Sequence, residues 1–126
     1  MNKEIIQTAN APAPIGPYNQ AVKAGNFLFL SGQIALDAAT GELVNDSVKA
    51  ETNQVMKNIV AILAAANAST ANIVKTTIFL TDMALFAEVN EVYATYFSGN
   101  EPARETVAVK GLPKNVNVEI SVTAFL

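Results

Sequence analysis

The 126-residue sequence contains no cysteine, no histidine and no tryptophan. Without cysteine, the chain can form neither disulfide bonds nor thiolate sites. Without histidine, it lacks the commonest metal ligand and the usual proton shuttle, which excludes zinc sites and Ser-His-Asp triads. Its chemistry must therefore use carboxylates, hydroxyls, lysines, backbone groups or water. We expect no metal site. The sequence contains no nucleotide-binding motif such as a Walker A loop, so we also expect no cofactor.

Positive charge is also scarce. Eight basic residues stand against eleven acidic ones, for a net charge of −3 and an isoelectric point near 4.8. Such a chain has little overall attraction to a phosphate backbone, so nucleic acid is an unfavourable partner. Seven of the basic residues are lysines and the eighth is a single arginine, Arg104. The planar guanidinium of that residue is therefore a candidate for a specific role.

Long hydrophobic runs are absent as well. Residues 1–7 are too short for a signal-peptide core, and the alanine-rich run 59–66 is too short to span a bilayer. We expect a soluble cytoplasmic protein without a membrane partner, forming a single domain over residues 1–126, because no linker or repeat interrupts the chain. Its mean hydropathy of +0.27 is high for so short a chain, which favours burial of surplus apolar surface against other subunits.

Hydrophobic periodicity predicts strands interspersed with two amphipathic helices. Residues 12–18 hold three of the five prolines and form a rigid loop. The predicted elements are a strand at 27–34 that is apolar on both faces, a helix capped by Asp46 or Ser47 and ended by Asn67, a strand at 73–80, a helix capped by Thr81 or Asp82 and followed by Gly99, and strands at 104–110 and 116–124. This order predicts an α+β fold in which both helices cover one face of a mixed sheet. The opposite face would then be free for oligomerisation.

The turn at residues 111–115 predicts a hairpin between the last two strands. In one register of that hairpin, Arg104 and Thr106 would share a face with Glu119 and Ser121. A slip of one residue would separate the two pairs, because side chains alternate between the faces of a strand. The sequence alone does not decide between the two registers.

Arg104 and Glu119 are the candidate catalytic residues. Arg104 could clamp a substrate carboxylate with two parallel hydrogen bonds, or could be a surface arginine paired with Glu101 or Glu105. Glu119 lies on the polar face of the last strand, where burial would raise its pKa and allow it to position or deprotonate a water molecule. The alternative is a glutamate that merely faces solvent.

Three further residues are candidates for a binding pocket. Ser31 and Gly32 follow the first predicted strand, where glycine would let a ligand approach the backbone closely and serine would add a hydroxyl. A simple strand-ending turn is the other interpretation. Tyr18 closes the proline-rich loop and could either supply a phenol to the pocket or pack as an ordinary aromatic side chain.

These residues fall within a set of short motifs that closely resemble the RidA (YjgF) family of reactive intermediate deaminases. The motifs occur in order along nearly the whole chain: APAPIGPYNQAV at 11–22, SGQI at 31–34, KTTIFL at 75–80, VNEVY at 89–93, PAR at 102–104, LPK at 112–114 and VEI at 118–120. The resemblance implies a chorismate-mutase-like α+β fold and a homotrimer. In that trimer the sheets form a central barrel, and the active sites lie in clefts between subunits.

The resemblance further implies hydrolysis of 2-enamino and 2-imino acids, such as 2-aminoacrylate released by pyridoxal-phosphate-dependent dehydratases, to 2-oxo acids and ammonia. By the same resemblance, Arg104 grips the substrate carboxylate and Glu119 holds the attacking water. Tyr18, Ser31 and Gly32 match pocket residues, and the backbone of Thr106 would lie beside the substrate. The chain departs from the family pattern at Glu105, Thr106 and Ser121, and these differences bear on substrate range.

Two other functions remain open at this level. A non-catalytic trimer of the same fold could bind or sense 2-oxo acids through Arg104, and Glu119 would then be dispensable. An RNA-directed role is disfavoured by the acidic balance, the single arginine and the absence of histidine.

Overall fold

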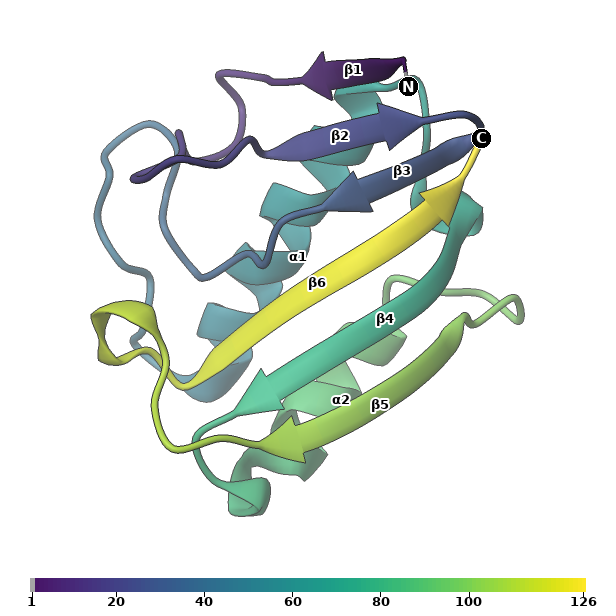
Figure 1. Cartoon of the computed structure of the whole chain (residues 1–126). Helices are drawn as coiled ribbons and strands as arrows, with labels where there is room; N and C mark the ends of the chain where they lie inside the picture. Colours follow the sequence, from purple (N-terminus) through teal and green to yellow (C-terminus); the bar gives the residue numbers. More distant parts are fainter. Residues whose placement is uncertain (1) are drawn as a thin grey trace.

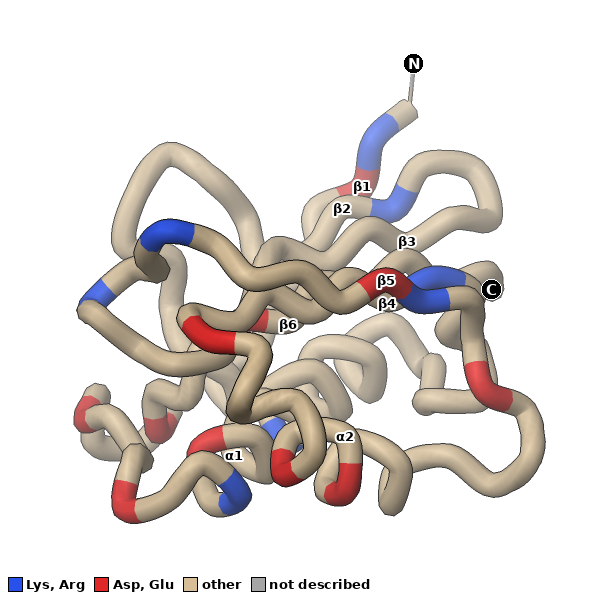
Figure 2. The backbone as a smooth tube through the Cα atoms, turned by 90° about the horizontal axis from the view of Figure 1, so that it is seen from below, with Lys and Arg blue, Asp and Glu red and all other residues tan. Residues whose placement is uncertain are grey.

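A computed structural model describes residues 2–126 as a six-stranded mixed sheet with two α-helices on one face (Figure 1). The strands lie in the order β1-β2-β3-β6-β4-β5. The elements are β1 Lys3–Ile6, β2 Ala21–Ala24, β3 Phe27–Leu30, α1 Val48–Ala65, β4 Ile73–Leu80, α2 Phe86–Ala94, β5 Ala103–Ala108 and β6 Val118–Phe125, with 3-10 turns at Thr70–Asn72, Met83–Leu85 and Pro113–Asn115. The predicted α+β class and the two helices on one face are confirmed, as Figure 2 also shows.

Helix α1 begins and ends where the sequence predicts. The Ser47 hydroxyl, rather than Asp46, accepts a hydrogen bond from the backbone N–H of Ala50. At the other end, Asn67 has a left-handed φ of 58°. Asp82 caps the 3-10 turn that leads into α2, not α2 itself, by accepting from the backbone N–H of Ala84. The last aromatic residues of the predicted second helix, Tyr96 and Phe97, lie beyond its end.

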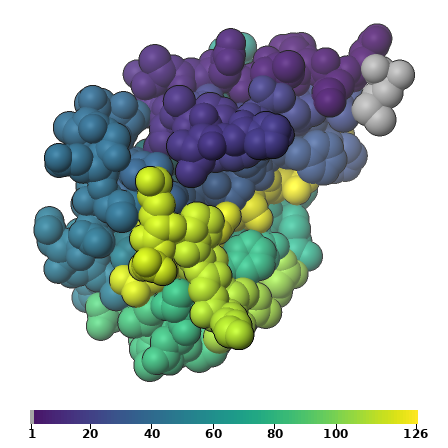
Figure 3. All heavy atoms as spheres, turned by 60° about the vertical axis from the view of Figure 1, so that its left-hand side comes forward, coloured from purple at the N-terminus to yellow at the C-terminus, as the bar shows by residue number. Residues whose placement is uncertain are grey.

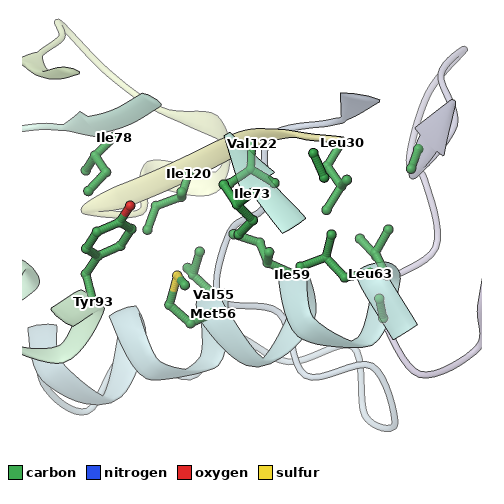
Figure 4. Close-up of a cluster of buried hydrophobic side chains, with 14 of the residues drawn as sticks. Leu30, Val55, Met56, Ile59, Leu63, Ile73, Ile78, Tyr93, Ile120 and Val122 are labelled. Carbon is green, nitrogen blue, oxygen red and sulfur yellow. The ribbon is translucent and has the colours of Figure 1, made fainter. Parts of the chain in front are cut away.

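The core lies between α1 and the central strands (Figure 4). In β6, every second residue is buried, and these side chains face α1. Opposite them, the apolar stripe of α1 supplies Val55, Met56, Ile59, Ile62 and Leu63, all at 0% exposure. Burying each such side chain contributes roughly 1.5–3 kcal/mol, so this layer holds α1 and β6 together firmly.

The predicted hairpin between the last two strands is wrong. Strand β5 pairs in parallel with β4, and β4 pairs antiparallel with β6, so β4 lies between them. The reason is that α2 returns the chain beside β4 in a crossover, which places β5 parallel to β4 at the sheet edge. The following turn then carries the chain past the end of β4 to its other side. No local signal in the turn distinguishes this path from a hairpin.

The prediction of a strand at 27–34 buried on both faces is also wrong in part. Strand β3 ends at Leu30, and only one of its faces is buried within the chain. Phe27 and Phe29 are 43% and 47% exposed and lie on the face opposite the helices, where Phe125 packs edge-on against Phe27. This open face, turned toward the viewer in Figure 1, carries the surplus apolar surface that the sequence predicts. Within residues 2–126, neither helix has the length and apolar character that crossing a membrane requires.

Candidate functional site

A cavity of about 380 Å³ lies where the proline-rich loop, the segment after β3 and the turn before β6 meet. Figure 3 shows the proline-rich loop in purple beside the yellow-green segment that precedes β6. Four predicted site residues line the cavity: Tyr18, Ser31, Gly32 and Glu119. We call this space the Glu119 cavity. Much of its remaining wall is apolar, with Ile34, Leu36 and Pro113 among the lining residues.

Glu119 lies on the open face of β6 and is partly buried, which raises the pKa of its carboxyl. The next residue, Ile120, exchanges two backbone hydrogen bonds with Gln33, at 2.8 and 3.1 Å. Glu119 also explains the glycine at position 32: a Cβ there would lie 2.0 Å from Glu119 Oε2. The structure thus gives Gly32 a definite role, because its missing side chain leaves room for the carboxylate.

Gln20, which the sequence does not single out, holds the proline-rich loop in place. Its side chain is buried, accepts a hydrogen bond from the Thr8 backbone N–H (2.7 Å) and donates to the carbonyl oxygens of Thr8, Ala11 and Pro12. Buried amides of this kind satisfy backbone groups that have no strand partner. The loop that carries Tyr18 is therefore built around one glutamine.

Ser31 and Tyr18 are held by local hydrogen bonds. The Ser31 hydroxyl donates to the carbonyl of Asn19 at 2.6 Å, and the Ser31 backbone N–H donates to the carbonyl of Gln20 at 2.9 Å. The Tyr18 hydroxyl accepts from the backbone N–H of Ile15 at 3.3 Å, and the ring is 47% exposed. Both hydroxyls therefore have fixed positions in the wall of the cavity.

Arg104 lies in a separate hollow lined by Asn90, Tyr93 and Glu101, among others, which we call the Arg104 hollow. Its Nη1 donates to Asn90 Oδ1 at 2.8 Å, and its guanidinium carbon lies 5.1 Å from the ring centre of Tyr93 and 5.6 Å from that of Phe86. Two aromatic faces and one amide thus orient the cation. Among residues 2–126, Arg104 forms no salt bridge with Glu101 or Glu105.

Glu105, the neighbour of Arg104, points to the open face instead. It forms a 2.9 Å ion pair with Lys75 Nζ and accepts a hydrogen bond from the Thr77 hydroxyl. The hydrogen bond from Thr77 is the largest of the causes that lower the pKa of Glu105, and the hydrogen bond and charge of Lys75 lower it further. This carboxylate is therefore engaged away from the guanidinium.

The sheet register separates the two candidate catalytic residues. Arg104 is opposite Thr76 on β4, whereas Glu119 is opposite Phe79. Positions 76 and 79 differ by an odd number of residues and so face opposite sides of the sheet. Arg104 accordingly lies on the helix side and Glu119 on the open side. The sequence leaves open whether the two residues share a face of the sheet, and the structure shows that they do not. One chain alone therefore does not bring them together.

Thr106 lies on the same face as Arg104, two residues further along β5. Its hydroxyl oxygen is buried and has no hydrogen-bond partner among residues 2–126. The same residues contain no group of three or more acidic side chains placed to hold a metal ion.

Two polar residues on the buried stripe of α1 are also not predicted as functional from the sequence. Asn58 donates to the carbonyl oxygens of Ile34 and Leu36 and so fixes one wall of the Glu119 cavity. Glu51 accepts hydrogen bonds from residues at the start of β6. The signal for both was available: they share a helical face with Val55 and Ile62, where a polar residue interrupts an otherwise apolar pattern.

Comparisons with known proteins find similar sequences over nearly the whole chain. Residues 8–126 match the family model described as Endoribonuclease L-PSP. A RutC family protein of Pyrococcus horikoshii is 54% identical over 123 residues, which cover 98% of each chain. The 2-iminobutanoate/2-iminopropanoate deaminase of Mus musculus is 46% identical over 122 residues, covering 97% of this chain and 90% of that protein.

Solved structures give the same result for the fold. RidA from an Antarctic Psychrobacter species superposes with a TM-score of 0.94 at 44% sequence identity, covering 98% of this chain and 99% of that one. The six-stranded sheet with two helices on one face is therefore shared over essentially the whole length.

Proposed function

Because this chain belongs to the RidA (YjgF) family, we propose that it is a cytoplasmic deaminase that hydrolyses 2-imino and 2-enamino acids to 2-oxo acids and ammonia. The observation that carries the proposal is the Glu119 cavity, where a partly buried carboxylate with a raised pKa lies among Tyr18, Ser31 and Gly32. The deaminase name of the mouse relative supports the same reaction class.

The proposed reaction balances without a covalent intermediate. 2-Aminoacrylate first takes a proton at its terminal carbon and loses one from its nitrogen, which converts it to its tautomer 2-iminopropanoate. Water then adds to the carbon of the C=N bond while the nitrogen gains a proton, and the resulting carbinolamine expels ammonia to give pyruvate. An imine carbon is already electrophilic, so the enzyme has to supply only orientation, a placed water and proton transfer.

Glu119 would hold and activate the water. A carboxylate whose pKa is raised accepts a proton more readily than one at the ordinary value, and it can return that proton to the departing nitrogen. The fixed hydroxyls of Tyr18 and Ser31 would orient the substrate beside it.

Arg104 would bind the substrate carboxylate. The hydrogen bond to Asn90 uses only one of its N–H groups, and two parallel bonds from the remaining groups would match a planar carboxylate. Each charge-assisted bond contributes about 1.5–3 kcal/mol, which is a large share of the binding energy of so small a molecule.

We further propose a homotrimer in which the sheets form a central barrel and the Arg104 hollow of one subunit completes the Glu119 cavity of the next. Two observations support it. Arg104 and Glu119 lie on opposite faces of one sheet, so one chain cannot close a site around both. In addition, the open face exposes Phe27, Phe29 and Phe125, an apolar surface suited to burial between copies.

The test is formation of 2-oxo acid from freshly generated 2-aminoacrylate. We expect Arg104→Ala to lower kcat/KM at least about a hundredfold, which corresponds to losing two charge-assisted bonds. Glu119→Gln should abolish turnover while calorimetry still detects pyruvate binding. Because Glu119 must be ionised to accept a proton, activity of the natural protein should fall as pH drops through a value above the ordinary glutamate pKa.

Two results would overturn this assignment. An Arg104→Ala variant with unchanged activity would remove the proposed mechanism. A natural protein that binds pyruvate but does not accelerate deamination would instead be a binding protein of the same fold.

A further inference from the structure

Glu51, in the first turn of α1, is a carboxylate at 0% exposure that the proposed mechanism does not use. Its Oε2 accepts hydrogen bonds from the backbone N–H groups of Asn117 (2.8 Å) and Val118 (3.2 Å). Its Oε1 accepts from the side-chain amide of Asn117 at 2.9 Å. Among residues 2–126 it has no lysine or arginine partner. The carboxylate is therefore held entirely by the start of β6.

Burying the Glu51 carboxylate destabilises the fold unless all of these hydrogen bonds form. Removing a carboxylate from water carries a large desolvation penalty, which hydrogen bonds to the charged form must offset. The three donors belong to the two residues that directly precede Glu119. The Glu51 contact therefore fixes the backbone at the point from which Glu119 projects.

Further contacts complete the restraint around Glu119. The Asn117 carbonyl accepts from the Thr81 backbone N–H at 3.1 Å, which ties the same point to the end of β4. On the other side of Glu119, Ile120 exchanges two backbone hydrogen bonds with Gln33. Glu119, which is opposite Phe79 in the ladder with β4, thus lies between two such contact points, and Glu51 supplies the side-chain contacts of the first one.

We propose that Glu51 is a positioning residue for the deamination: by holding Asn117 and Val118, it keeps the Glu119 carboxylate in the cavity against Gly32. The inference rests on the proposed function. Glu51 acts through the backbone and touches no substrate. A displacement of about 1 Å at a catalytic group can cost a factor of about 100 in rate, so the anchor has a measurable consequence.

The experiment compares Glu51→Ala with Glu51→Gln. Glutamine has nearly the same shape, and its amide oxygen can accept both backbone N–H groups while the Asn117 amide turns to accept from the new NH2 group. We expect Glu51→Ala to lower kcat about 10- to 100-fold with little change in KM, and Glu51→Gln to stay within about threefold of the natural protein. Asn117→Ala, which removes one of the three bonds, should lie between them and tests the same anchor if Glu51→Ala does not fold.

Ile62→Ala is the matched control for stability. Ile62 is a fully buried residue of α1 that belongs to the core between the helix and the sheet. This variant should unfold at a lower temperature and yet keep its kcat at a temperature where it is folded. A loss of kcat in Ile62→Ala equal to that in Glu51→Ala would reduce Glu51 to a stability residue and overturn the proposal.

A second measurement does not depend on activity. In a carbon-13 NMR titration, the Glu119 carboxyl of the natural protein and of Glu51→Gln should titrate above the ordinary glutamate pKa. In Glu51→Ala it should return toward the ordinary value, because the side chain would no longer be held in its partly buried place. If the natural protein does not deaminate, the proposed function fails, and this titration still decides whether Glu51 positions Glu119.

Two outcomes contradict the proposal. One is a folded Glu51→Ala variant whose kcat and Glu119 titration match those of the natural protein. The other is a Glu51→Gln variant as impaired as Glu51→Ala, because the negative charge rather than the position of the strand would then be responsible.

Discussion

The Glu119 cavity and the Arg104 hollow are built in different ways. In the cavity, hydrogen bonds to main-chain groups hold the walls: the backbone of Gln33 pairs with that of Ile120, and the Gln20 side chain bonds to the backbone of the loop that carries Tyr18. In the hollow, side chains alone hold Arg104, through Asn90 and two aromatic rings. The Glu119 cavity is therefore a rigid part of the fold, whereas the orientation of Arg104 in its hollow depends on a few side chains and changes when one of them is replaced.

This difference predicts how each half responds to substitution. Main-chain geometry leaves no room for adjustment, so a small steric change in the Glu119 cavity should affect the rate of the chemical step. Changes around Arg104 should weaken binding of the substrate carboxylate by the energy of single contacts.

The largest expected effect tests whether the two halves come from different copies. Arg104→Ala and Glu119→Gln should each be nearly inactive, but trimers assembled from an equal mixture should recover about a quarter of the natural activity, because one ordered pair of neighbours in four combines an intact arginine with an intact glutamate. Steady-state rates of the whole reassembled mixture measure this. Mixed trimers purified through an affinity tag on one variant, each with one complete site in three, should recover about a third.

Either variant unfolded and reassembled alone provides the control and should stay inactive. Confirmed mixed trimers without recovered activity would refute a site shared between subunits.

Gly32→Ala should give the next largest effect. The added methyl group would lie 2.0 Å from Glu119 Oε2, so the carboxylate must move, and we expect kcat to fall about 10- to 100-fold with the fold retained. Gly32 does not have a left-handed φ, so alanine adds no backbone strain there. Gly111→Ala is the control, because no atom lies within 4 Å of its added Cβ. Equal kcat values in the two variants would contradict the rigid Glu119 cavity.

Asn90→Ala should give the smallest effect and should act on binding. Losing one charge-assisted hydrogen bond of about 1.5 kcal/mol predicts a KM increase of about tenfold with kcat nearly unchanged. Glu91→Ala, on the same helix but paired with Lys49, should leave KM unchanged and is the control. A fall in kcat without a change in KM would show that substitutions around the Arg104 hollow do not act through binding of the substrate carboxylate.

Regular elements with strong patterns could be predicted from the sequence. The alternation in β6 and the apolar stripe of α1 define both elements, and the capping residue Ser47 marks where the helix begins. Strands β1 and β2 are not predicted, because each has only four residues and these include charged residues or alanines, whereas β3, of equal length, consists of four large apolar residues. The position of β4 between β5 and β6 depends on the α2 crossover, which is a tertiary feature that no local pattern contains.

The same limit applies to the candidate site. Tyr18, Ser31, Gly32 and Glu119 line one cavity, whereas the separation of Arg104 from them follows from pairing with β4. The helical pattern marks Glu51 as a buried polar residue, but neither its partners nor those of Gln20 can be identified from the sequence, because most of them are backbone groups. Their chemistry gives no hint of partners until the chain is folded.

The central place of β6 has a consequence for how the protein folds. Strands β1 to β3 form one part of the sheet and β4 with β5 another, and β6 is the strand that pairs with both. Until residues 118–125 dock, the chain consists of two pieces without a common ladder of hydrogen bonds, and contacts this distant in sequence form slowly. Glu119 belongs to the same strand. Closing the sheet and delivering the carboxylate are therefore one event, so a partly folded chain cannot hold an assembled Glu119 cavity.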